Sequence, residues 1–442
     1  MTQDGKFDNA GSIATNVADG FTMVAVGDLM MRRPIIKNQR SGFGDVAEIL
    51  QRADATFGNL ETNIFDVRAF KGSPQVNGDS YHVGPPELGP DLKTMGFNLL
   101  SLANNHTFDW GLEGMRETGR VLDQTGIIHA GMGENLAQAV AARYLDTARG
   151  RVALVSFAAT FTPMSRACDP AGEAPGRPGL AALRLKNSIT APPEMLESLR
   201  RISNALPNSP SREDEDRVVL AGATFKIGDK VGYSFEANPR DIHEILRNVR
   251  QGKQFADFLI VSNHGHEPGE WSQEPPDYEQ SLARKLIDAG ADAYVGHGPH
   301  QLRGIEIYKG RPIFYSLGNF VFDNLQTVEG ADYFAEYGKD PRIDTVADLL
   351  VEANKGWAIA EFYESIVTVS RFEGNQLAEL KLIPVELGYS ERLANRGVPR
   401  LAPWPDAEAI LERLQRLSKP FGTHITIENG VGIIRVTSSS QR

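Results

Sequence analysis

The fold prediction starts from Phe21-Thr22-Met23-Val24-Ala25-Val26-Gly27-Asp28, an apolar run that is closed by a glycine and an acidic residue. A run of this kind predicts a buried β-strand, and the Gly-Asp pair indicates where the strand ends. Asp28 is then expected at the carboxyl edge of the strand. Taken alone, Asp28 fits the cap of a turn or helix equally well.

The same pattern recurs along the chain. Further apolar runs are predicted as strands at 53–57, 97–102, 255–261 and 293–295, and they are followed in turn by Asn59 with Glu61, Asn104-Asn105-His106, His264 with His266, and His297 with His300. Helical patterns lie between them, at 45–52, 111–125, 134–142, 238–249 and 278–289. Alternating strands and helices predict a layered α/β fold. Because ligands bind at the carboxyl edge of such sheets, we expect one site assembled from these loops.

Two stretches interrupt the alternation. Residues 160–235 combine Pro, Gly and Arg with the charged run 212–217 and are predicted to form a lid-like insertion, and the acidic stretch 323–357 is expected to pack outside the sheet. Closer to the end of the chain, antiparallel strands are predicted at 365–371 and 376–387, a helix at 406–417 and closing β structure at 424–436. Residues 1–20 are predicted to be a flexible leading segment, and residues 21–442 a single domain.

Composition excludes several classes of function. The chain has 442 residues, is 41% hydrophobic and carries a formal net charge of -11, which argues against nucleic acid as the main partner. Its one cysteine, Cys168, excludes an internal disulfide. We find neither a signal peptide nor an apolar stretch long enough to span a bilayer, so a cytoplasmic protein without a membrane anchor is expected. Oligomeric state does not follow from these features.

The polar clusters consist of carboxylates, carboxamides and imidazoles. These are the ligands that suit Mn, Fe or Zn, and one or two divalent ions and hydrolytic chemistry are therefore predicted. Gly296-His297-Gly298-Pro299-His300 has the clearest ligand pattern, because Gly and Pro fix a tight loop with an imidazole at either end. His266 fits a ligand, a supporting group or a substrate contact, and Asp109 is placed to orient His106. His82, His129, His243 and His424 are expected at the surface or in packing.

Arginines in and after the insertion are candidates for binding the substrate. Arg166, Arg177, Arg184 and Arg303 could present guanidinium forks to carboxylate or phosphate groups, although ordinary structural or solvated arginines fit as well. The substrate expected is a small anionic ester or a peptide-like amide.

Together, these motifs and their order resemble the CapA (poly-γ-glutamate synthesis) family of bacterial capsule-synthesis proteins, relatives of the calcineurin-like metallophosphoesterases. The resemblance covers about 21–322 and rests on Gly27-Asp28, Gly58-Asn59-Leu60-Glu61, Asn104-Asn105-His106 with Asp109 and Gly111, His264-Gly265-His266-Glu267, Gly296-His297-Gly298-Pro299-His300 and Tyr315-Ser316-Leu317-Gly318-Asn319-Phe320. It implies a four-layer α/β/β/α sandwich with metals at the strand ends, completed by the carboxyl-terminal strands.

The resemblance also implies roles for individual residues. Asp28 and His300 would hold a first metal, Glu61 would bridge, and a second metal would be held by Asn105, His264 and His297. His106 would protonate the leaving group, with Asp109 and His266 as further catalytic candidates, and Asn59 and Asn104 would contact substrate. The sequence departs from the superfamily pattern where Met30 follows Asp28-Leu29 in place of a histidine, and where Glu61 or Asn59 replaces a bridging aspartate.

Three functions are compatible with these observations. The first is a metal-dependent hydrolase of phosphoester or γ-glutamyl-type amide bonds. The second is a component of poly-γ-glutamate synthesis or export that acts by binding. The third is a peptide-modifying enzyme similar to lasso-peptide epimerases, in which Asp and His side chains would move a Cα proton without metal.

Overall fold

The computed structural model describes residues 15–37, 41–74, 82–207, 216–323, 331–357 and 359–436. Of the leading segment predicted to be flexible, residues 1–14 lie outside these ranges. Within the described part, Val17 is buried and its N–H donates to Asn375 Oδ1 at 3.0 Å. Most of the charged run 212–217 also lies outside the described residues.

The larger sheet has ten strands and contains the first strand predicted from sequence. Its order is β23-β24-β21-β20-β1-β2-β5-β6, with β19 beside β1 and β22 beside β21. Strands β1, β2, β5, β6 and β19 run parallel, whereas β20 and β21 are antiparallel as predicted. The bounds are β1 (Phe21–Met30), β2 (Ala55–Leu60), β5 (Leu99–Ser101), β6 (Ile128–Ala130), β19 (Asn319–Phe322), β20 (Glu364–Glu373), β21 (Gln376–Glu386), β22 (Arg400–Leu401), β23 (Thr426–Glu428) and β24 (Val431–Arg435).

The second sheet has six strands in the order β17-β18-β16-β15-β9-β8. Its parallel centre is formed by β9, β15, β16 and β18, with β8 and β17 antiparallel at the edges. The bounds are β8 (Arg143–Thr147), β9 (Gly150–Ala158), β15 (Phe258–His264), β16 (Ala293–His297), β17 (Ile305–Tyr308) and β18 (Arg311–Phe314). Both parallel centres are buried along nearly their whole length, as parallel strands covered on both faces should be.

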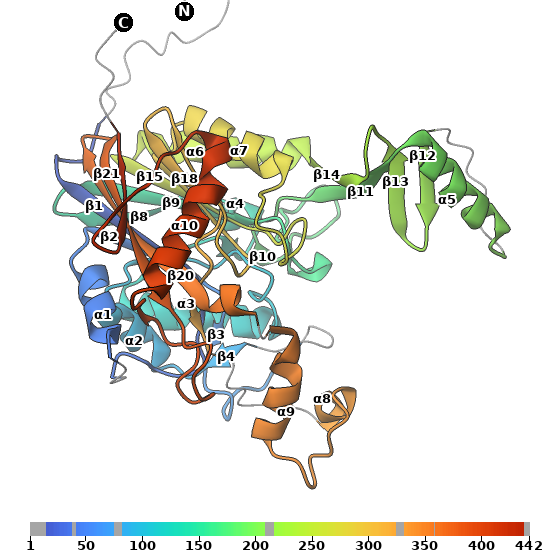
Figure 1. The fold of residues 1–442 in the computed structure, drawn as a ribbon, viewed down its shortest axis with the longest axis horizontal. Helices are drawn as coiled ribbons and strands as arrows, with labels where there is room; N and C mark the ends of the chain where they lie inside the picture. The colour runs from blue at the N-terminus through green and yellow to red at the C-terminus, as the bar shows by residue number, and fades with distance from the viewer. Residues whose placement is uncertain are drawn as a thin grey trace, which may run out of the picture.

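The two sheets pack face to face and helices cover their outer faces (Figure 1). One hydrophobic cluster joins the sheets, a second joins the larger sheet to α1 (Phe43–Gln51), α2 (Leu88–Met95) and α3 (Gly111–Thr125), and a third joins the smaller sheet to α6 (Pro239–Gln254) and α7 (Asp277–Asp288). Helix α10 (Asp406–Ser418) packs against β21 and β17. The predicted α/β/β/α sandwich is therefore confirmed.

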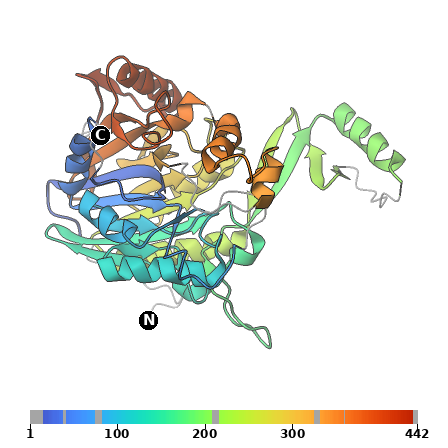
Figure 2. The same cartoon turned by 90° about the horizontal axis from the view of Figure 1, so that it is seen from below.

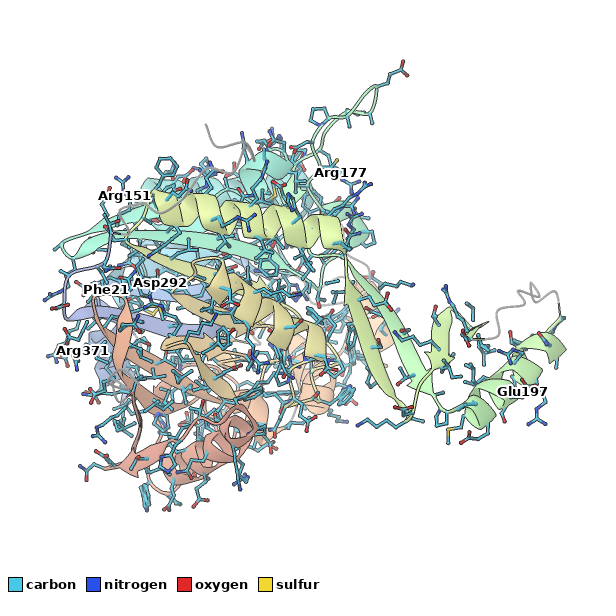
Figure 3. All side chains as sticks on the ribbon, turned by 90° about the horizontal axis from the view of Figure 1, so that it is seen from above. Phe21, Arg151, Arg177, Glu197, Asp292 and Arg371 are labelled. Carbon is cyan, nitrogen blue, oxygen red and sulfur yellow. The ribbon has the colours of Figure 1, made fainter. Side chains whose placement is uncertain are left out.

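The later part of the first insertion, beginning with Leu185, forms an arm that is not part of the sandwich. A four-stranded sheet and helix α5 (Pro193–Ala205) project from the body, with Glu197 far out on this arm (Figures 2 and 3). The strands of the arm are β11 (Leu185–Ala191), β12 (Arg217–Leu220), β13 (Ala223–Ile227) and β14 (Gly232–Ala237). The second insertion holds α8 (Ala331–Glu336) and α9 (Val346–Ala353), which lie outside the two sheets (Figure 1).

The remaining elements are short. They are β3 (Asn63–Ile64) paired with β4 (Val83–Gly84), β7 (Met132–Gly133) paired with β10 (Gly179–Leu180), and α4 (Leu136–Ala139). The helix predicted at 134–142 is wrong in extent: α4 is a single turn that begins after the capping side chain of Asn135 and ends at Ala139, and Arg143 begins β8. In the described part of the chain, no helix combines the length and apolar character needed to cross a bilayer.

Substitution of Phe258 tests the packing between the two sheets. The ring of Phe258 is fully buried and lies 5.0 Å from Phe21 and 4.8 Å from Phe372, measured between ring centroids. Phe258→Ala is expected to lower the free energy of unfolding by about 3–5 kcal/mol, because the cavity lies between two sheets that cannot both collapse onto it. Phe255→Ala, at a side chain that is 60% exposed, is the matched control and should change stability little. Chemical denaturation measures both; equal losses would contradict the assignment of this core.

Candidate metal centre

Strand register brings the predicted clusters into rows. Asp28 on β1 is level with Asn59 on β2 and with Asn319 on β19. In the second sheet, His264 on β15 is level with His297 on β16. Because the two sheets face each other, their carboxyl edges bring these rows together in one place.

The lack of a side chain at Gly27 allows the backbone of β1 to lie close to that of Gly318. A Cβ atom at this position would lie 1.9 Å from the carbonyl oxygen of Gly318, so a residue with a side chain does not fit without moving the backbone. The N–H of Asp28 donates to that same carbonyl oxygen at 3.0 Å. The Gly27-Asp28 pair thus marks a site where two backbones meet, and it is not a turn cap.

Asp28 is held by donors on both oxygens. Asn59 Nδ2 donates to Oδ1 at 2.8 Å and lies 3.1 Å from His264 Nδ1, and the N–H of Gly298 donates to Oδ2 at 3.1 Å. Asn104 Nδ2 donates to Asn59 Oδ1 at 3.2 Å. Both asparagines were predicted to contact substrate. Their side chains are buried and hydrogen-bonded to residues around Asp28, which positions that carboxylate, and a substrate contact stays a prediction.

Glu61 is the least satisfied group in the site. Its carboxylate is completely buried and neither oxygen has a hydrogen-bond partner. Oε1 lies 3.4 Å from His264 Nε2 and 3.9 Å from His106 Nε2. Burial first, and then the nearby charge of Asp28, raises the pKa of Glu61 well above its ordinary value. Since a buried carboxylate is costly unless its charge and lone pairs are met, these atoms fit a bound cation.

Three groups of side chains could share a metal ion. They are Asp28, Glu61 and His300; Glu61, His264 and His266; and His266, Glu270 and His300, and within each group the possible ligand atoms lie within 4.8 Å of one another. The groups overlap, so they outline adjacent positions in one centre. Carboxylate and imidazole donors suit Mn, Fe or Zn, as expected from the sequence. Burial lowers the pKa of His264 well below its ordinary value and also lowers that of His300, which keeps both imidazoles neutral and able to coordinate.

His300 is held in an uncommon backbone conformation. Its φ is 57°, which non-glycine residues rarely adopt, and Gly298, two residues before it, has φ +113°. The ring Nδ1 lies 2.9 Å from Asn319 Oδ1 and 3.7 Å from Asp28 Oδ2, while Asn319 Nδ2 donates to the carbonyl of Phe362 at 2.9 Å. The strained loop therefore turns His300 toward Asp28, and Asn319 fixes its ring.

His297 and Asn105 were predicted to bind the second metal. His297 Nε2 lies 3.1 Å from the carbonyl of Val26 and Nδ1 lies 3.3 Å from Ser262 Oγ, so both ring nitrogens have partners away from the three groups. This placement makes His297 a strut between the sheets, and its role as ligand gains no support from the geometry. Asn105 Oδ1 is buried without a hydrogen-bond partner, and its role as ligand stays a prediction.

His106 and His266 each have a carboxylate behind them. His106 Nδ1 lies 2.6 Å from Asp109 Oδ2, which is the orienting contact predicted from the sequence. His266 Nδ1 lies 2.9 Å from Glu270 Oε1, and its Nε2 lies 3.0 Å from His264 Nε2. The backbone N–H of His266 donates to Thr160 Oγ1 at 2.8 Å. Both imidazoles are therefore oriented with Nε2 toward the centre; their catalytic roles stay predictions.

With this geometry in place, the chain can be compared with known families. The model described as "Bacterial capsule synthesis protein PGA_cap" matches residues 22–324. The chain belongs to this family. The resemblance inferred from the motifs is thereby confirmed, including the place of the family among the calcineurin-like proteins.

Individual relatives of this PGA_cap protein differ widely in similarity. The uncharacterized protein y4sH of Sinorhizobium fredii (strain NBRC 101917 / NGR234) is 64% identical, over 98% of this chain and 97% of its own. The PGA biosynthesis protein CapA of Bacillus subtilis (strain 168) is 29% identical over 67% of this chain and 62% of its own. A putative 5'-nucleotidase structure from Staphylococcus aureus is 11% identical with a TM-score of 0.34, covering 90% of this chain and 58% of its own. That TM-score is too low to support an argument, so the fold rests on the layers described above.

Sequence patterns did not single out Glu270, Asn319 or His82 as site residues. Asn319 lies within a family motif, but its role depends on a strand that reaches β1 only in the folded chain. Glu270 lies in a loop and its only signal is the spacing of four residues from His266. His82 was expected at the surface or in packing; it is buried, and its ring packs 4.3 Å from that of His106, measured between centroids.

Three of the four arginines predicted to bind substrate have partners elsewhere. Arg303 is 1% exposed, and its guanidinium donates to the carbonyls of Glu267 (2.8 Å) and Ser272 (3.2 Å), so it supports the His266 loop from behind. Arg184 pairs with Asp241 at 2.7 Å at the base of the arm. Arg177 is an exposed side chain on the outside of the body (Figure 3), where its guanidinium donates to the carbonyls of Arg166 and Pro163. These partners explain the arginines structurally, and a substrate contact stays a prediction.

Glu279 behind the centre allows a test by pH. It accepts a hydrogen bond from Tyr294 at 2.9 Å and lies 3.5 Å from Arg303, yet burial outweighs both contacts and raises its pKa from 4.5 to about 7. Folding therefore favours the protonated acid, so the contribution to stability is present below the unfolded pKa and is lost as pH rises through about 7.

Glu279→Gln should remove this dependence. Relative to the original chain, the free energy of unfolding of the variant is expected to rise by on the order of 2 kcal/mol between about pH 5 and about pH 8. Denaturation series across this range measure the difference, and Glu113→Gln at an exposed carboxylate is the control. Parallel profiles for the original chain and Glu279→Gln would show that Glu279 does not titrate as inferred.

Proposed function

We propose that this PGA_cap protein is a metal-dependent hydrolase that cleaves an anionic phosphoester or a γ-glutamyl-type amide. The Glu61 carboxylate supports this proposal most. It is buried between the imidazoles of His264 and His106, and neither of its oxygens has a hydrogen-bond partner. A fold that needed no cation here would be more stable with an uncharged side chain at this position.

The donor set indicates which residues would hold the metal. Asp28, Glu61 and His300 form one side of the centre, and His264, His266 and Glu270 extend it. A divalent ion at such a place polarises the group under attack and lowers the pKa of bound water. Asn59, Asn319 and Thr160 keep the donors in position through the hydrogen bonds described above.

His106 is the residue proposed to protonate the leaving group. Asp109 binds Nδ1, which leaves Nε2 as the nitrogen on the side of Glu61. The aspartate fixes the ring orientation and stabilises the charged imidazolium, so that a proton on Nε2 can be transferred to the departing oxygen or nitrogen.

The relatives favour a second candidate. The names "Capsule biosynthesis protein CapA" and "Probable polyglutamine synthesis accessory protein" belong to relatives from Bacillus anthracis and Mycobacterium tuberculosis, which are 28% and 24% identical. A component that binds a glutamyl polymer during its assembly would fit these names without any turnover. It would also need no bound metal.

Glu61→Gln separates these functions. The protein purified without chelator is expected to carry one or two equivalents of metal, and the variant to lose most of it, because the amide supplies no charge. Turnover of phosphoester or γ-glutamyl amide substrates should fall on the order of 100-fold. Elemental analysis and a substrate screen measure the two effects, with Glu113→Gln as an isosteric control at an exposed position.

Other results would favour another function. Metal loss with unchanged turnover would refute the metal dependence of the proposed hydrolase, and hydrolysis would then depend on proton transfer by the same side chains. A folded protein that retains neither metal nor turnover, yet binds a glutamyl polymer, would favour the binding role.

A further inference from the structure

A cavity lies close to the metal centre, beside the residues that follow the end of β1. Its volume is about 490 Å³, within the range typical of small-ligand sites. The described residues that line it include two arginines, two acids and an apolar floor: Arg32, Arg68, Asp66, Glu87, Phe65 and Val83. None of these residues belongs to the candidate metal groups.

The cavity is connected to the centre through two imidazoles. Arg32 follows Asp28 by four residues on the same chain segment, and its Nη2 lies 2.9 Å from His82 Nδ1. A guanidinium can only donate, so His82 accepts this bond as a neutral ring. The His82 ring also contacts His106, and the two rings meet edge to face at 86°. One wall of the cavity therefore adjoins the residue proposed to protonate the leaving group.

The apolar floor of the cavity is formed by packed aromatic side chains, so the cavity is preformed. Phe65 stacks on Phe70 at 4.1 Å between ring centroids and meets Trp110 edge to face at 5.3 Å, and Val83 belongs to the same buried cluster. The pairing of β3 with β4 holds the two sides of this floor together. Arg32 is only 4% exposed, so its charge is carried by a rigid part of the wall.

The charges of the lining indicate the kind of ligand. Two cationic and two anionic side chains face the same space, with Arg32 buried and Arg68, Asp66 and Glu87 exposed at its mouth. A phosphate ester would gain from the arginines but would meet two carboxylates, which disfavours it. A ligand that carries a carboxylate and an ammonium group on one carbon would match the two arginines with the first group and the two acids with the second.

We propose that this cavity binds the amino-acid end of the substrate, with the carboxylate at Arg32 and Arg68 and the ammonium group at Asp66 and Glu87. The inference rests on the hydrolase function proposed above and narrows its substrate to the γ-glutamyl class. The first residue of a γ-glutamyl chain carries a free α-carboxylate and α-ammonium on one carbon, while its side-chain amide extends away from them. The cavity would hold that head and direct the amide toward His106.

The test measures binding of γ-glutamyl-alanine by titration calorimetry on the Glu61→Gln background, in which heat from turnover is not expected. Arg68→Ala should raise the dissociation constant about tenfold, the effect of losing one charge-assisted bond. Lys71→Ala makes the same change in net charge on a nearby exposed residue outside the lining, and it should leave the dissociation constant unchanged. Arg32→Ala is a second variant, with circular dichroism as the check on its folding.

A change of ligand tests the ammonium half of the cavity. Glutaryl-alanine has the same chain and the same carboxylate without the ammonium group, so it should bind more weakly and remain sensitive to Arg68→Ala. The combined Asp66→Asn and Glu87→Gln variant should weaken γ-glutamyl-alanine about tenfold and leave glutaryl-alanine unchanged. This pattern of paired losses is not expected from a general loss of stability.

The outcomes separate this inference from the hydrolase proposal. If γ-glutamyl-alanine fails to bind, or binds Arg68→Ala and Lys71→Ala equally well, the cavity is not the site for an amino-acid head. If a phosphomonoester binds instead and Arg68→Ala weakens it, the charge argument is wrong. Binding with the expected losses, together with an original chain (Glu61 intact) that shows no turnover and no metal, would uphold the cavity and refute the hydrolase.

Discussion

The contact between the backbones of Gly27 and Gly318 is the constraint on which the site depends. It leaves no room for a Cβ atom at Gly27, and it lets the Asp28 N–H bond directly to the Gly318 carbonyl. Strand β19 can then lie against the end of β1, which places Asn319 level with Asp28. Since Asn319 in turn bonds His300, one backbone approach sets the distance between the first carboxylate and its imidazole.

The cost of this arrangement is buried charge. Asp28 is stabilised by an asparagine and a backbone N–H, whereas Glu61 has neither and its pKa is raised by burial beside Asp28. Neutral imidazoles at His264 and His300 add no charge that would compensate both acids. A site of this kind is unfavourable for the chain alone and becomes favourable with a cation, so stability and metal binding are expected to be coupled.

Under these proposals, the end of β1 and the residues directly after it would have two tasks. Asp28 faces the centre and Arg32 faces the neighbouring cavity, with His82 and His106 between them. Chemistry and recognition of substrate would thus be positioned by one strand and the residues directly after it, which limits the relative movement of the two. The arm formed by residues of the first insertion lies to the side of this body, and the side chains of Arg184, Arg177 and Arg303 bind Asp241 and backbone carbonyls.

The sequence alone determined the strand ends that carry chemistry, the four-layer fold through its family resemblance, and the candidates Asp28, Glu61, His264 and His300, because apolar runs and the Gly, Asn and His residues after them are local signals. It did not single out β9 at the centre of the second sheet, nor Glu270 and His82. Only the tertiary structure shows that the buried Arg303 supports the His266 loop and that His297 connects the two sheets. The physical reason is that a side chain's partner comes from distant segments: the pattern shows where a strand stops, and packing of the two sheets decides what each side chain meets there.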